Sequence, residues 1–392
     1  MKLFHTADWH LGKLVHGVYM TEDQRYVLNQ FIEDIRRDKP DAVIIAGDLY
    51  DRGVPPTEAV ELLDDVLETI VAELGVPVLA IAGNHDSPDR LSFGTALMEG
   101  RGLHLTGQLR SQPKPVVLRD EFGEVHFHLV PYADPAIVRH VLGEEDIRSH
   151  NDAMRAITTR LTEGMSPDVR HVLVGHAFVT PLGEAADNTS DSERPLAIGG
   201  AEYVSASMFD RFHYTALGHL HQAHFVRSEK IRYAGSPLKY SISEERHNKG
   251  YLVVELDEAG KAAIEKRELK PLRDMRRVEA SIEELEKHPV NDDYVYVTLL
   301  NDNPVLFPME KVRAVYPNAM HVERRIAMAN TVAGTSGISS EADGSVSRKE
   351  RDPVQLFADF YMEVKGQELT REKRSMFSAE YEALLREEEG LT

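Results

Sequence analysis

Short apolar runs alternate with amphipathic segments through the first third of the chain. The runs whose composition predicts buried strands cover residues 3–6, 42–46 and 76–82. Between them, apolar side chains recur at helical spacing in residues 27–35 and 60–74, which predicts two amphipathic helices. This alternation of strands and helices is typical of an α/β domain in which helices cover a sheet.

Two local patterns add detail to these helices. Thr21 and Gln24 fit a capping box, in which the threonine caps the first turn and the glutamine reaches back. The helix expected over residues 57–74 has a broad apolar face, because Leu62 and Val66 lie outside its main stripe. That excess predicts either packing into the sheet or an interface between helices.

The middle third of the chain is rich in strands. The segments with strand-like composition are residues 116–118, 125–130, 171–174, 214–217, 224–227, 231–234 and 251–256. One helix is expected among them, around residues 153–161. Together with the first third, these elements predict a first domain, residues 1–270, that contains two mixed sheets covered by helices.

After Lys270-Pro271 the pattern predicts smaller units. Three strands with two helices between them predict a compact βαβαβ domain over residues 271–330. Residues 331–351, which are rich in glycine, serine and alanine, are expected to form a flexible linker. Residues 352–392 are expected to form a pair of helices.

The predicted helix pair carries a stripe of aromatic residues. They are Phe357, Phe360, Tyr361, Phe377 and Tyr381. A helix pair beyond a flexible linker is expected to have no core of its own for them. We therefore expect the pair to fold back on its own chain or to dock on a partner, with these five side chains as the anchors.

The composition of the chain excludes several kinds of chemistry. The 392 residues include 45 Lys and Arg and 65 Asp and Glu, so the formal net charge is −20. Proteins that hold nucleic acid by bulk attraction are basic, so a nucleic-acid function would need a local site here. The absence of cysteine excludes disulfides, thiolate ligands and thiol nucleophiles. No apolar run reaches the roughly 18 residues of a membrane span, so we expect a soluble cytoplasmic protein.

Five short polar motifs directly follow predicted strands. They are Asp8-Trp9-His10, Gly47-Asp48-Leu49-Tyr50-Asp51, Gly83-Asn84-His85-Asp86, Gly175-His176 and Gly218-His219-Leu220-His221. An α/β protein builds its site at such positions. The Asp-x-His and His-x-His pairs can each point to one side of an extended backbone. The glycines permit tight turns and close approach of the backbone.

The motifs supply imidazole and oxygen ligands without sulfur. This donor set suits Mn, Fe or Zn better than Ca²⁺. There are enough ligands for two ions, and a carboxylate that bridges two cations roughly 3.5–4 Å apart is a recurrent hydrolytic design. A single motif of this kind is a weak indication, but five in this order predict a hydrolytic metal site.

The order and spacing of the five motifs resemble those of the calcineurin-like metallophosphoesterases. Within that superfamily, the segments FHTADWHLG (residues 4–12), GDLYDR (47–52) and YAGSP (233–237) resemble the nuclease subunits of bacterial double-strand-break repair complexes. The resemblance runs to about residue 325, and these nuclease subunits also end in a linker and a pair of helices. It implies a four-layer αββα sandwich with a small βαβαβ capping domain and a C-terminal helix pair.

The resemblance also implies roles for single residues. The matched ligands of a first metal are Asp8, His10, Asp48 and His221, and those of a second are Asp48, Asn84, His176 and His219. The ions are expected to be Mn²⁺, with Mg²⁺ as a weaker candidate. His85 matches a histidine that faces the scissile phosphate and acts as the general acid, and Asp86 is expected to accept from its ring. A purely structural role for His85 is the alternative.

Asp51 departs from family members that have histidine at this position. An ionised carboxylate cannot donate to a phosphate, so we expect Asp51 to hold a backbone or neighbouring group instead. Other side chains could line a DNA groove: Lys13, His16 and Tyr19 after the first ligand pair, and the basic cluster of Arg273, Arg276 and Arg277. A solvated surface role is the alternative for each.

The implied activity is a metal-dependent DNA nuclease. The resemblance implies 3′–5′ double-strand exonuclease and single-strand or hairpin endonuclease activity in DNA repair, recombination and replication. It also implies a coiled-coil ATPase partner, bound by the helix pair, and a homodimer within a 2:2 complex, formed through residues 57–74 and 87–99. The alternatives are a stand-alone metallophosphoesterase for small phosphodiesters or phosphoproteins, and a scaffold without activity.

Overall fold

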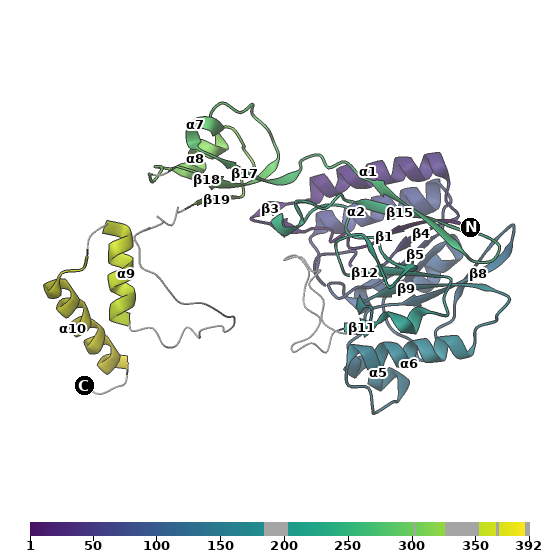
Figure 1. Ribbon diagram of the computed structural model, residues 1–392. Helices are drawn as coiled ribbons and strands as arrows, with labels where there is room; N and C mark the ends of the chain where they lie inside the picture. Colours follow the sequence, from purple (N-terminus) through teal and green to yellow (C-terminus); the bar gives the residue numbers. More distant parts are fainter. Residues whose placement is uncertain (184–202, 302, 326–352, 366–367, 389–392) are drawn as a thin grey trace, which may run out of the picture. The chain divides into compact units, whose positions relative to one another are not determined.

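The structure is a computed structural model that describes residues 1–183, 203–301, 303–325, 353–365 and 368–388 (Figure 1). The chain divides into two compact units, Met1–Ala327 and Met328–Thr392. The linker expected over residues 331–351 lies outside the described residues. The domain boundaries expected from the sequence stay predictions.

The first six-stranded sheet contains the N-terminal strand near its centre. Strands β1, β4, β5 and β6 are parallel to one another, whereas β15 pairs with β1 and β16 with β15 in antiparallel fashion. The strand order is β16 (Ala262–Glu268), β15 (Gly250–Leu256), β1 (Lys2–Thr6), β4 (Ala42–Ile45), β5 (Val78–Ile81) and β6 (Leu103–Thr106). The sequence did not predict β6 and β16.

The second six-stranded sheet is built from the middle of the chain. Its order is β13 (His224–Val226), β14 (Ser228–Tyr233), β12 (Tyr214–Gly218), β9 (Arg170–His176), β8 (Gly123–Val130) and β7 (Val116–Asp120). The four central strands are parallel, and the two edge strands are antiparallel to their neighbours. These six strands and β15 of the first sheet confirm the seven strands predicted for the middle third.

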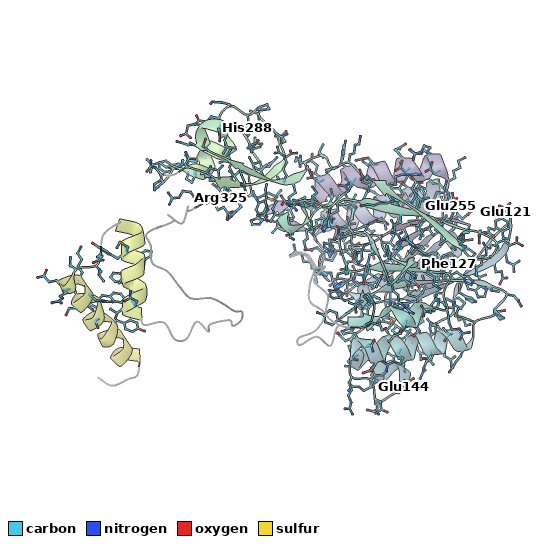
Figure 2. All side chains as sticks on the ribbon, in the orientation of Figure 1. Glu121, Phe127, Glu144, Glu255, His288 and Arg325 are labelled. Carbon is cyan, nitrogen blue, oxygen red and sulfur yellow. The ribbon has the colours of Figure 1, made fainter. Side chains whose placement is uncertain are left out.

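Side-chain alternation along the strands produces the four layers. On β1, Leu3 packs between the two sheets with Phe127 of β8, which Figure 2 labels. Phe4 points the other way, into the core under the helices of the first sheet. The helices that cover the first sheet are α1 (Thr21–Asp38) and α2 (Thr57–Leu67). Helix α2 continues as η1 (Glu68–Glu73). On the second sheet, α5 (Pro135–Leu142) and α6 (His150–Glu163) cover the outer face (Figure 1). The αββα sandwich is confirmed.

Two helix predictions need correction. Only one helix was expected in the middle third, but α5 precedes α6. The helix expected over residues 87–99 is divided into α3 (Pro88–Leu91) and α4 (Thr95–Met98), because Gly94 adopts a left-handed conformation with φ of 71°. Leu62 and Val66 are buried in the core under the first sheet. The broad face of α2 therefore packs into the sheet.

The three-stranded module is the predicted βαβαβ unit. Its strands β17 (Met275–Ala280), β18 (Tyr294–Leu299) and β19 (His321–Arg324) are parallel. Helices α7 (Ile282–Leu285) and α8 (Pro308–Arg313) connect them and cover a small core around Val295 and Val297. The sandwich also contains a hairpin, β2 (Leu14–Val15) and β3 (Val18–Tyr19), and a short pair, β10 (Phe178–Thr180) and β11 (Tyr203–Ser205).

The second unit contains the helices α9 (Pro353–Lys365) and α10 (Arg371–Glu388). The rings of Phe357 and Phe377 stack between them with centroids 4.0 Å apart. Tyr361 contacts Phe357, and Tyr381 contacts Phe377. Four of the five expected anchors thus contact one another, but none of the described side chains of the pair is buried. Phe360 is 58% exposed. No helix among the described residues has the length and apolarity to cross a membrane.

Candidate metal centre

All seven residues expected to bind metal lie at the carboxyl ends of parallel strands. Each sits in the loop after its strand or in the strand's last residue: Asp8 and His10 (β1), Asp48 (β4), Asn84 (β5), His176 (β9), and His219 and His221 (β12). The two sheets pack face to face, so these ends meet. Two sets of their ligand atoms lie within 4.8 Å of one another: Asp8, His10 and His221, and Asp8, Asp48 and His176.

The loops that hold these side chains are fixed by backbone hydrogen bonds. The amide of Asp8 donates to Gly47 O (3.0 Å) and the amide of His10 donates to Asp48 O (2.9 Å). Asp8, His10, Asp48 and His219 all have positive φ, between 46° and 106°. Such conformations cost on the order of 1–3 kcal/mol for residues with a Cβ. The surrounding structure therefore holds four expected ligands in strained positions, which is typical of functional sites.

Two glycines allow the strands to come together at this point. A Cβ on Gly83 would lie 2.2 Å from Asp48 Oδ1, and a Cβ on Gly47 would lie 2.3 Å from His176 Nδ1. Any larger residue would push an expected ligand out of place. The close approach predicted for the motif glycines is confirmed at these positions.

Three side chains form the first ligand group, on the β1 and β12 side. His10 Nε2 and His221 Nε2 are 3.1 Å apart. His221 donates from Nδ1 to Glu244 Oε1 (3.1 Å), which leaves a lone pair on its Nε2. Asp8 Oδ1 accepts from the amide of His219 (2.9 Å), but Asp8 Oδ2 is buried without a hydrogen-bond partner among the described residues.

A second ligand group surrounds His176. Its Nδ1 donates to the carbonyl of Ala46 (2.9 Å), so the lone pair of a neutral ring is on Nε2. That atom lies 2.9 Å from Asn84 Oδ1 and 3.4 Å from Asp48 Oδ2. His219 Nδ1 lies 3.3 Å from the same Asn84 oxygen. Acceptor atoms thus face one another here, and a cation between them would remove the repulsion.

Asp48 lies between the two groups. Its Oδ2 is 3.4 Å from His176 Nε2 and 3.7 Å from His10 Nε2, while its Oδ1 accepts from the amide of His85 (2.8 Å). Asp48 is 2% exposed. This is the position that a carboxylate bridging two cations must occupy.

The electrostatics of the group also fit bound cations. Burial raises the pKa of Asp8 to about 7. Burial also opposes ionisation of Asp48, but the imidazoles of His176 and His10 outweigh it and hold the pKa of Asp48 well below its usual range. Burial lowers the pKa of His176, but Asp48 and Asp8 outweigh it and raise that pKa to about 9. Without metal, protons on His176 would have to compensate the buried carboxylates.

These residues fit a centre of divalent metal ions. The donors are imidazole nitrogens and oxygens without sulfur, and one carboxylate oxygen points into the group with no hydrogen-bond partner among the described residues. A divalent cation could replace the protons that the cluster otherwise needs.

His85 lies beside the first group. Its ring packs edge-on against His10 with centroids 4.7 Å apart, and its Nδ1 donates to the carbonyl of Asp51 (2.8 Å). Nε2 is the nitrogen left for a substrate. His10, Asp51 and His85 also have ligand atoms within 4.8 Å of one another.

The expected role of Asp86 is wrong. Its carboxylate accepts from three backbone amides, those of Gly83 (2.9 Å), Leu49 (3.1 Å) and Tyr50 (2.9 Å). Asp86 thus ties the β4 and β5 loops together, and the backbone carbonyl of Asp51 orients His85. The carboxylate of Asp51 pairs with Lys13 (2.8 Å), which agrees with the expectation that it holds a neighbouring group.

Sequence reasoning missed four side chains that support the site. Gln24 does not form a capping box, because α1 has no side-chain cap; instead its Nε2 donates to the carbonyls of Trp9 (3.0 Å) and His10 (2.7 Å). Tyr240 donates to the carbonyl of Trp9. Glu244, which orients His221, pairs with Lys249 (2.5 Å). No motif indicated a role at the site for any of these residues, and only their tertiary contacts reveal it.

The expected basic cluster does not form a free cationic surface. Arg273 pairs with Asp23 (2.8 Å), Arg276 with Asp293 (2.8 Å), and Arg277 with Glu245 (3.3 Å). The three arginines therefore serve contacts within the first unit. His16 packs edge-on against Tyr296 of β18, and Tyr19 is 59% exposed.

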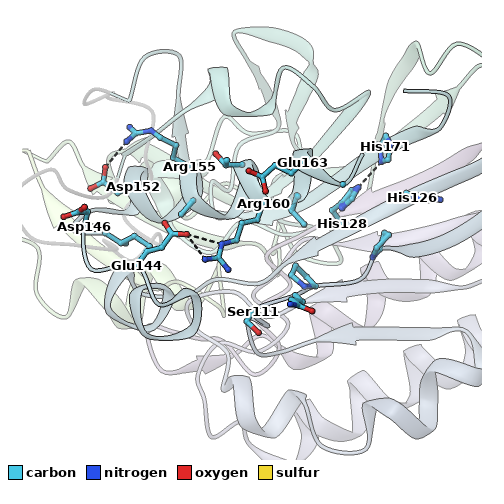
Figure 3. Close-up of a pocket in the computed structure, with 18 residues that line it drawn as sticks. Ser111, His126, His128, Glu144, Asp146, Asp152, Arg155, Arg160, Glu163 and His171 are labelled. Atoms are coloured by element: carbon cyan, nitrogen blue, oxygen red, sulfur yellow. Dashed lines mark hydrogen bonds and ion pairs between the residues drawn. The ribbon is translucent and has the colours of Figure 1, made fainter. Parts of the chain in front are cut away.

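A separate cavity of about 800 Å³ lies on the outer side of the second sheet (Figure 3). Its lining contains none of the seven expected ligands. Its arginines are paired with acids, Arg160 with Glu144 (2.8 Å) and Arg155 with Asp152 (3.2 Å), as the dashed lines in Figure 3 mark. The metal chemistry therefore belongs to the strand ends and not to this cavity.

Comparison with known proteins agrees with this geometry. Residues 1–176 match the family model of the calcineurin-like phosphoesterases, and residues 271–365 match that of the type 5 capsule protein repressor C-terminal domain. Among solved structures, a dimetal phosphatase from Danio rerio has 13% identity and a TM-score of 0.40, covering 69% of this chain and 98% of that one. A protein of Thermus thermophilus has 11% identity and a TM-score of 0.37, with 68% and 98% covered.

The αββα sandwich and the family match over residues 1–176 define a calcineurin-like metallophosphoesterase. One curated relative, the SbcD subunit of the nuclease SbcCD from Staphylococcus epidermidis, is 32% identical over 375 residues, which cover 95% of each chain. The chain belongs to the SbcD family.

Proposed function

We propose that this chain is a metal-dependent DNA nuclease that hydrolyses phosphodiester bonds as part of an SbcCD complex. Family membership over 95% of the chain supports this proposal. The observation that carries it is buried Asp48, whose carboxylate lies within 4 Å of ring nitrogens from both ligand groups. Processing of DNA ends in repair, recombination and replication, by 3′–5′ exonuclease and hairpin or single-strand endonuclease activity, is the role we propose.

Two divalent cations occupy the site in this proposal. The proposed ligands of the first are Asp8, His10, Asp48 and His221, and those of the second are Asp48, Asn84, His176 and His219. Mn²⁺ is the proposed ion, with Mg²⁺ as the alternative. Cations bound here supply hydroxide near neutral pH and neutralise phosphate charge.

His85 is the proposed general acid. With Nδ1 bound to the carbonyl of Asp51, the ring presents Nε2, which can carry a proton to the leaving sugar oxygen. The amide of His85 donates to Asp48 Oδ1, so the backbone ties the acid to the proposed bridging ligand. Asp86 contributes by fixing the two loops that carry these residues.

The partners follow from the family. We propose that the chain binds DNA and SbcC, a coiled-coil ATPase, and that the helix pair of α9 and α10 docks on SbcC. Phe360, as the exposed member of the aromatic stripe, is the first anchor in this proposal, followed by the edges of Phe357, Tyr361, Phe377 and Tyr381. Division into a nuclease domain (1–270), a capping domain (271–330), a linker (331–351) and a docking helix pair (352–392) is part of the proposal.

We also propose a homodimer within a 2:2 complex. Leu62 and Val66 are in the core and cannot contribute to it. The large apolar side chains exposed within residues 57–74 and 87–99 are Val60 (44% exposed), Phe93 (85%) and Leu97 (86%). These three residues, on α2 and around α4, replace the contact expected from two long helices.

A single assay tests the proposal. The full chain should digest linear and hairpin duplex DNA with Mn²⁺, faster when SbcC and ATP are present. His85→Ala should retain both metal ions and lose most of this activity, since only the proton donor is removed. Turnover of a small chromogenic diester without any cutting of DNA would favour a stand-alone phosphoesterase. Near-normal DNA cutting by His85→Ala would remove the proposed role of His85.

A further inference from the structure

The three-stranded module is attached to the sandwich at buried Asp23 of α1. Arg273, just before β17, donates from Nη1 to Asp23 Oδ2 (2.8 Å), and the hydroxyl of Tyr294 on β18 donates to the same oxygen (2.8 Å). Asp23 is 0% exposed. An apolar cluster surrounds this contact and consists of Val15, Met20, Met275, Tyr294 and Met320. The position of α1 is thereby coupled to that of the module.

Two more residues of the sandwich contact the start of β17. Lys239 donates to Asp274 Oδ1 (2.8 Å) and to the carbonyl of Met275 (3.2 Å). Glu245 accepts from the amide of Arg277 (3.2 Å), and its other carboxylate oxygen lies 3.3 Å from Arg277 Nε. Lys239 also donates to the carbonyl of Glu245 (2.7 Å), which joins these two contacts into one network. Asp23, Lys239 and Glu245 together form the seat of the module.

Each of these three seat residues is next in sequence to one that supports the metal site. Asp23 precedes Gln24, which donates to the carbonyl of His10 (2.7 Å). Lys239 precedes Tyr240, whose ring packs edge-on against His10 and His221 with centroids 5.6 and 5.9 Å away.

The third seat residue, Glu245, is also next in sequence to a residue that supports the metal site. Glu245 follows Glu244, which ends the 3₁₀ helix η4 (Ile242–Glu244) and accepts from His221 Nδ1 (3.1 Å). A shift of any seat residue moves its neighbour through the covalent backbone. Three connections thus run from the module to His10 and His221, two of which are joined by the hydrogen bond between Lys239 and Glu245.

The second ligand group has a different support. His176 is fixed by the carbonyl of Ala46, and both His176 and His219 have a ring nitrogen near Asn84 Oδ1. These partners lie in the sandwich, on loops after β4, β5 and β12. Among the described residues, the three connections from the module reach only His10 and His221.

We propose that Asp23, Lys239 and Glu245 are positioning residues, through which the seating of the three-stranded module sets the affinity of the first metal position alone. This inference rests on the proposed function, because it takes the metal assignment from it. Metal-ligand geometry is sensitive to such supports, whose loss typically costs 10–100-fold in affinity. Thermodynamic linkage makes the effect reciprocal, so a DNA or partner contact that shifts the module changes occupancy of the first position.

The test changes only the module side of the seat. The variant Arg273→Leu/Asp274→Ala removes partners of Asp23 and Lys239 and leaves every proposed metal ligand and its immediate support in place. The matched control is Arg325→Leu/Glu279→Ala, which removes an arginine and an acid from an exposed ion pair of the same module (3.0 Å). Tyr294→Phe, which loses only the hydroxyl that donates to Asp23, is the milder second variant if the double variant folds poorly.

Titration of Mn²⁺ into the metal-free full chain, followed by calorimetry, gives the readout. In a His219→Ala background, which retains the first position, the seat variant should bind Mn²⁺ about 10-fold more weakly than its parent. In a His221→Ala background, which retains the second position, the seat variant should bind as its parent does. The control should change neither value.

Several results would overturn the inference. They are an equal loss at both positions, no loss at either, the same loss in the control, or a parent chain that does not bind two Mn²⁺ ions. The readout contains no DNA, so it separates this inference from the proposed activity. A chain that shows the selective loss but does not cut DNA would refute the nuclease proposal and leave the coupling intact.

Discussion

Burial of His5 makes the stability of the sandwich depend on pH. The residue lies on β1 between the two sheets, is 0% exposed, and its Nε2 has no hydrogen-bond partner among the described residues. Burial lowers the pKa of the imidazole from 6.5 to about 3, against the raising effect of a hydrogen bond with the backbone of Leu217. The ring stays neutral in the folded chain at pH values where it is charged in the unfolded chain.

The sign and size of the effect follow from proton linkage. Below about pH 6.5 the unfolded chain binds a proton at this residue, whereas the folded chain binds one only near pH 3. The stability that neutral His5 allows is present above the unfolded pKa and is lost as the pH falls below it. At about 1.4 kcal/mol per pH unit, the loss between pH 8 and pH 5 is about 2 kcal/mol.

The assay uses Trp9, the only tryptophan of the chain, which is buried in the core under the first sheet. Urea unfolding of the metal-free chain is followed by its fluorescence at pH 8 and pH 5, for the parent and for His5→Gln. The pH-dependent loss of unfolding free energy should be about 2 kcal/mol larger in the parent, because other titrating groups cancel in the difference. His140→Gln, which removes an exposed histidine on α5, is the control. Equal pH dependence in parent and His5→Gln would refute the reasoning.

Three further predictions concern the site supports and the helix pair. Glu244→Gln should weaken Mn²⁺ binding roughly 10–100-fold, as measured by calorimetry. It should also lower the free energy of unfolding, because Lys249 then stays buried without the charge of Glu244. The double variant Glu244→Gln/Lys249→Met should recover the unfolding free energy in urea but not the affinity for Mn²⁺. A chain that ends at Gly334 should fold, bind metal and cleave a small phosphodiester, but should not co-purify with SbcC; unchanged co-purification would contradict the docking proposal. Phe360→Ala should weaken SbcC binding by about 10-fold or more with unchanged helicity by circular dichroism, whereas Phe377→Ala should reduce the helicity, and equal effects would argue against separate roles.

The sequence predicted most of the scaffold because local patterns carry it. Short apolar runs gave β1 and β4, and helical spacing gave α1 and α2. The polar motifs after these strands gave the positions of the proposed ligands, since the carboxyl ends of parallel strands meet at one edge. Two helix predictions failed. Gly94 was not recognised as a break within residues 87–99, and Pro135–Leu142 was not recognised as a helix.

The errors around the site have a common physical cause. Gln24 matched a capping box with Thr21, three residues before it, but its partners are the carbonyl of His10, 14 residues away, and Tyr240, 216 residues away. Asp86 was assigned to its neighbour His85, but its oxygens satisfy backbone amides from two loops. A short polar side chain takes the partners that folding leaves unsatisfied, and a sequence pattern does not contain that information.

The two ligand groups differ in what holds their histidines. His176 donates to a main-chain carbonyl at the end of β4, inside the sandwich, and no side-chain change can remove that acceptor. His221 donates to a carboxylate on a 3₁₀ turn whose next residue binds the three-stranded module. The support of His176 therefore lies within the sandwich, whereas the support of His221 is one residue from a contact with the module. If the seating of the module sets the first metal position, as proposed, this difference is the reason why the second position should not respond to it.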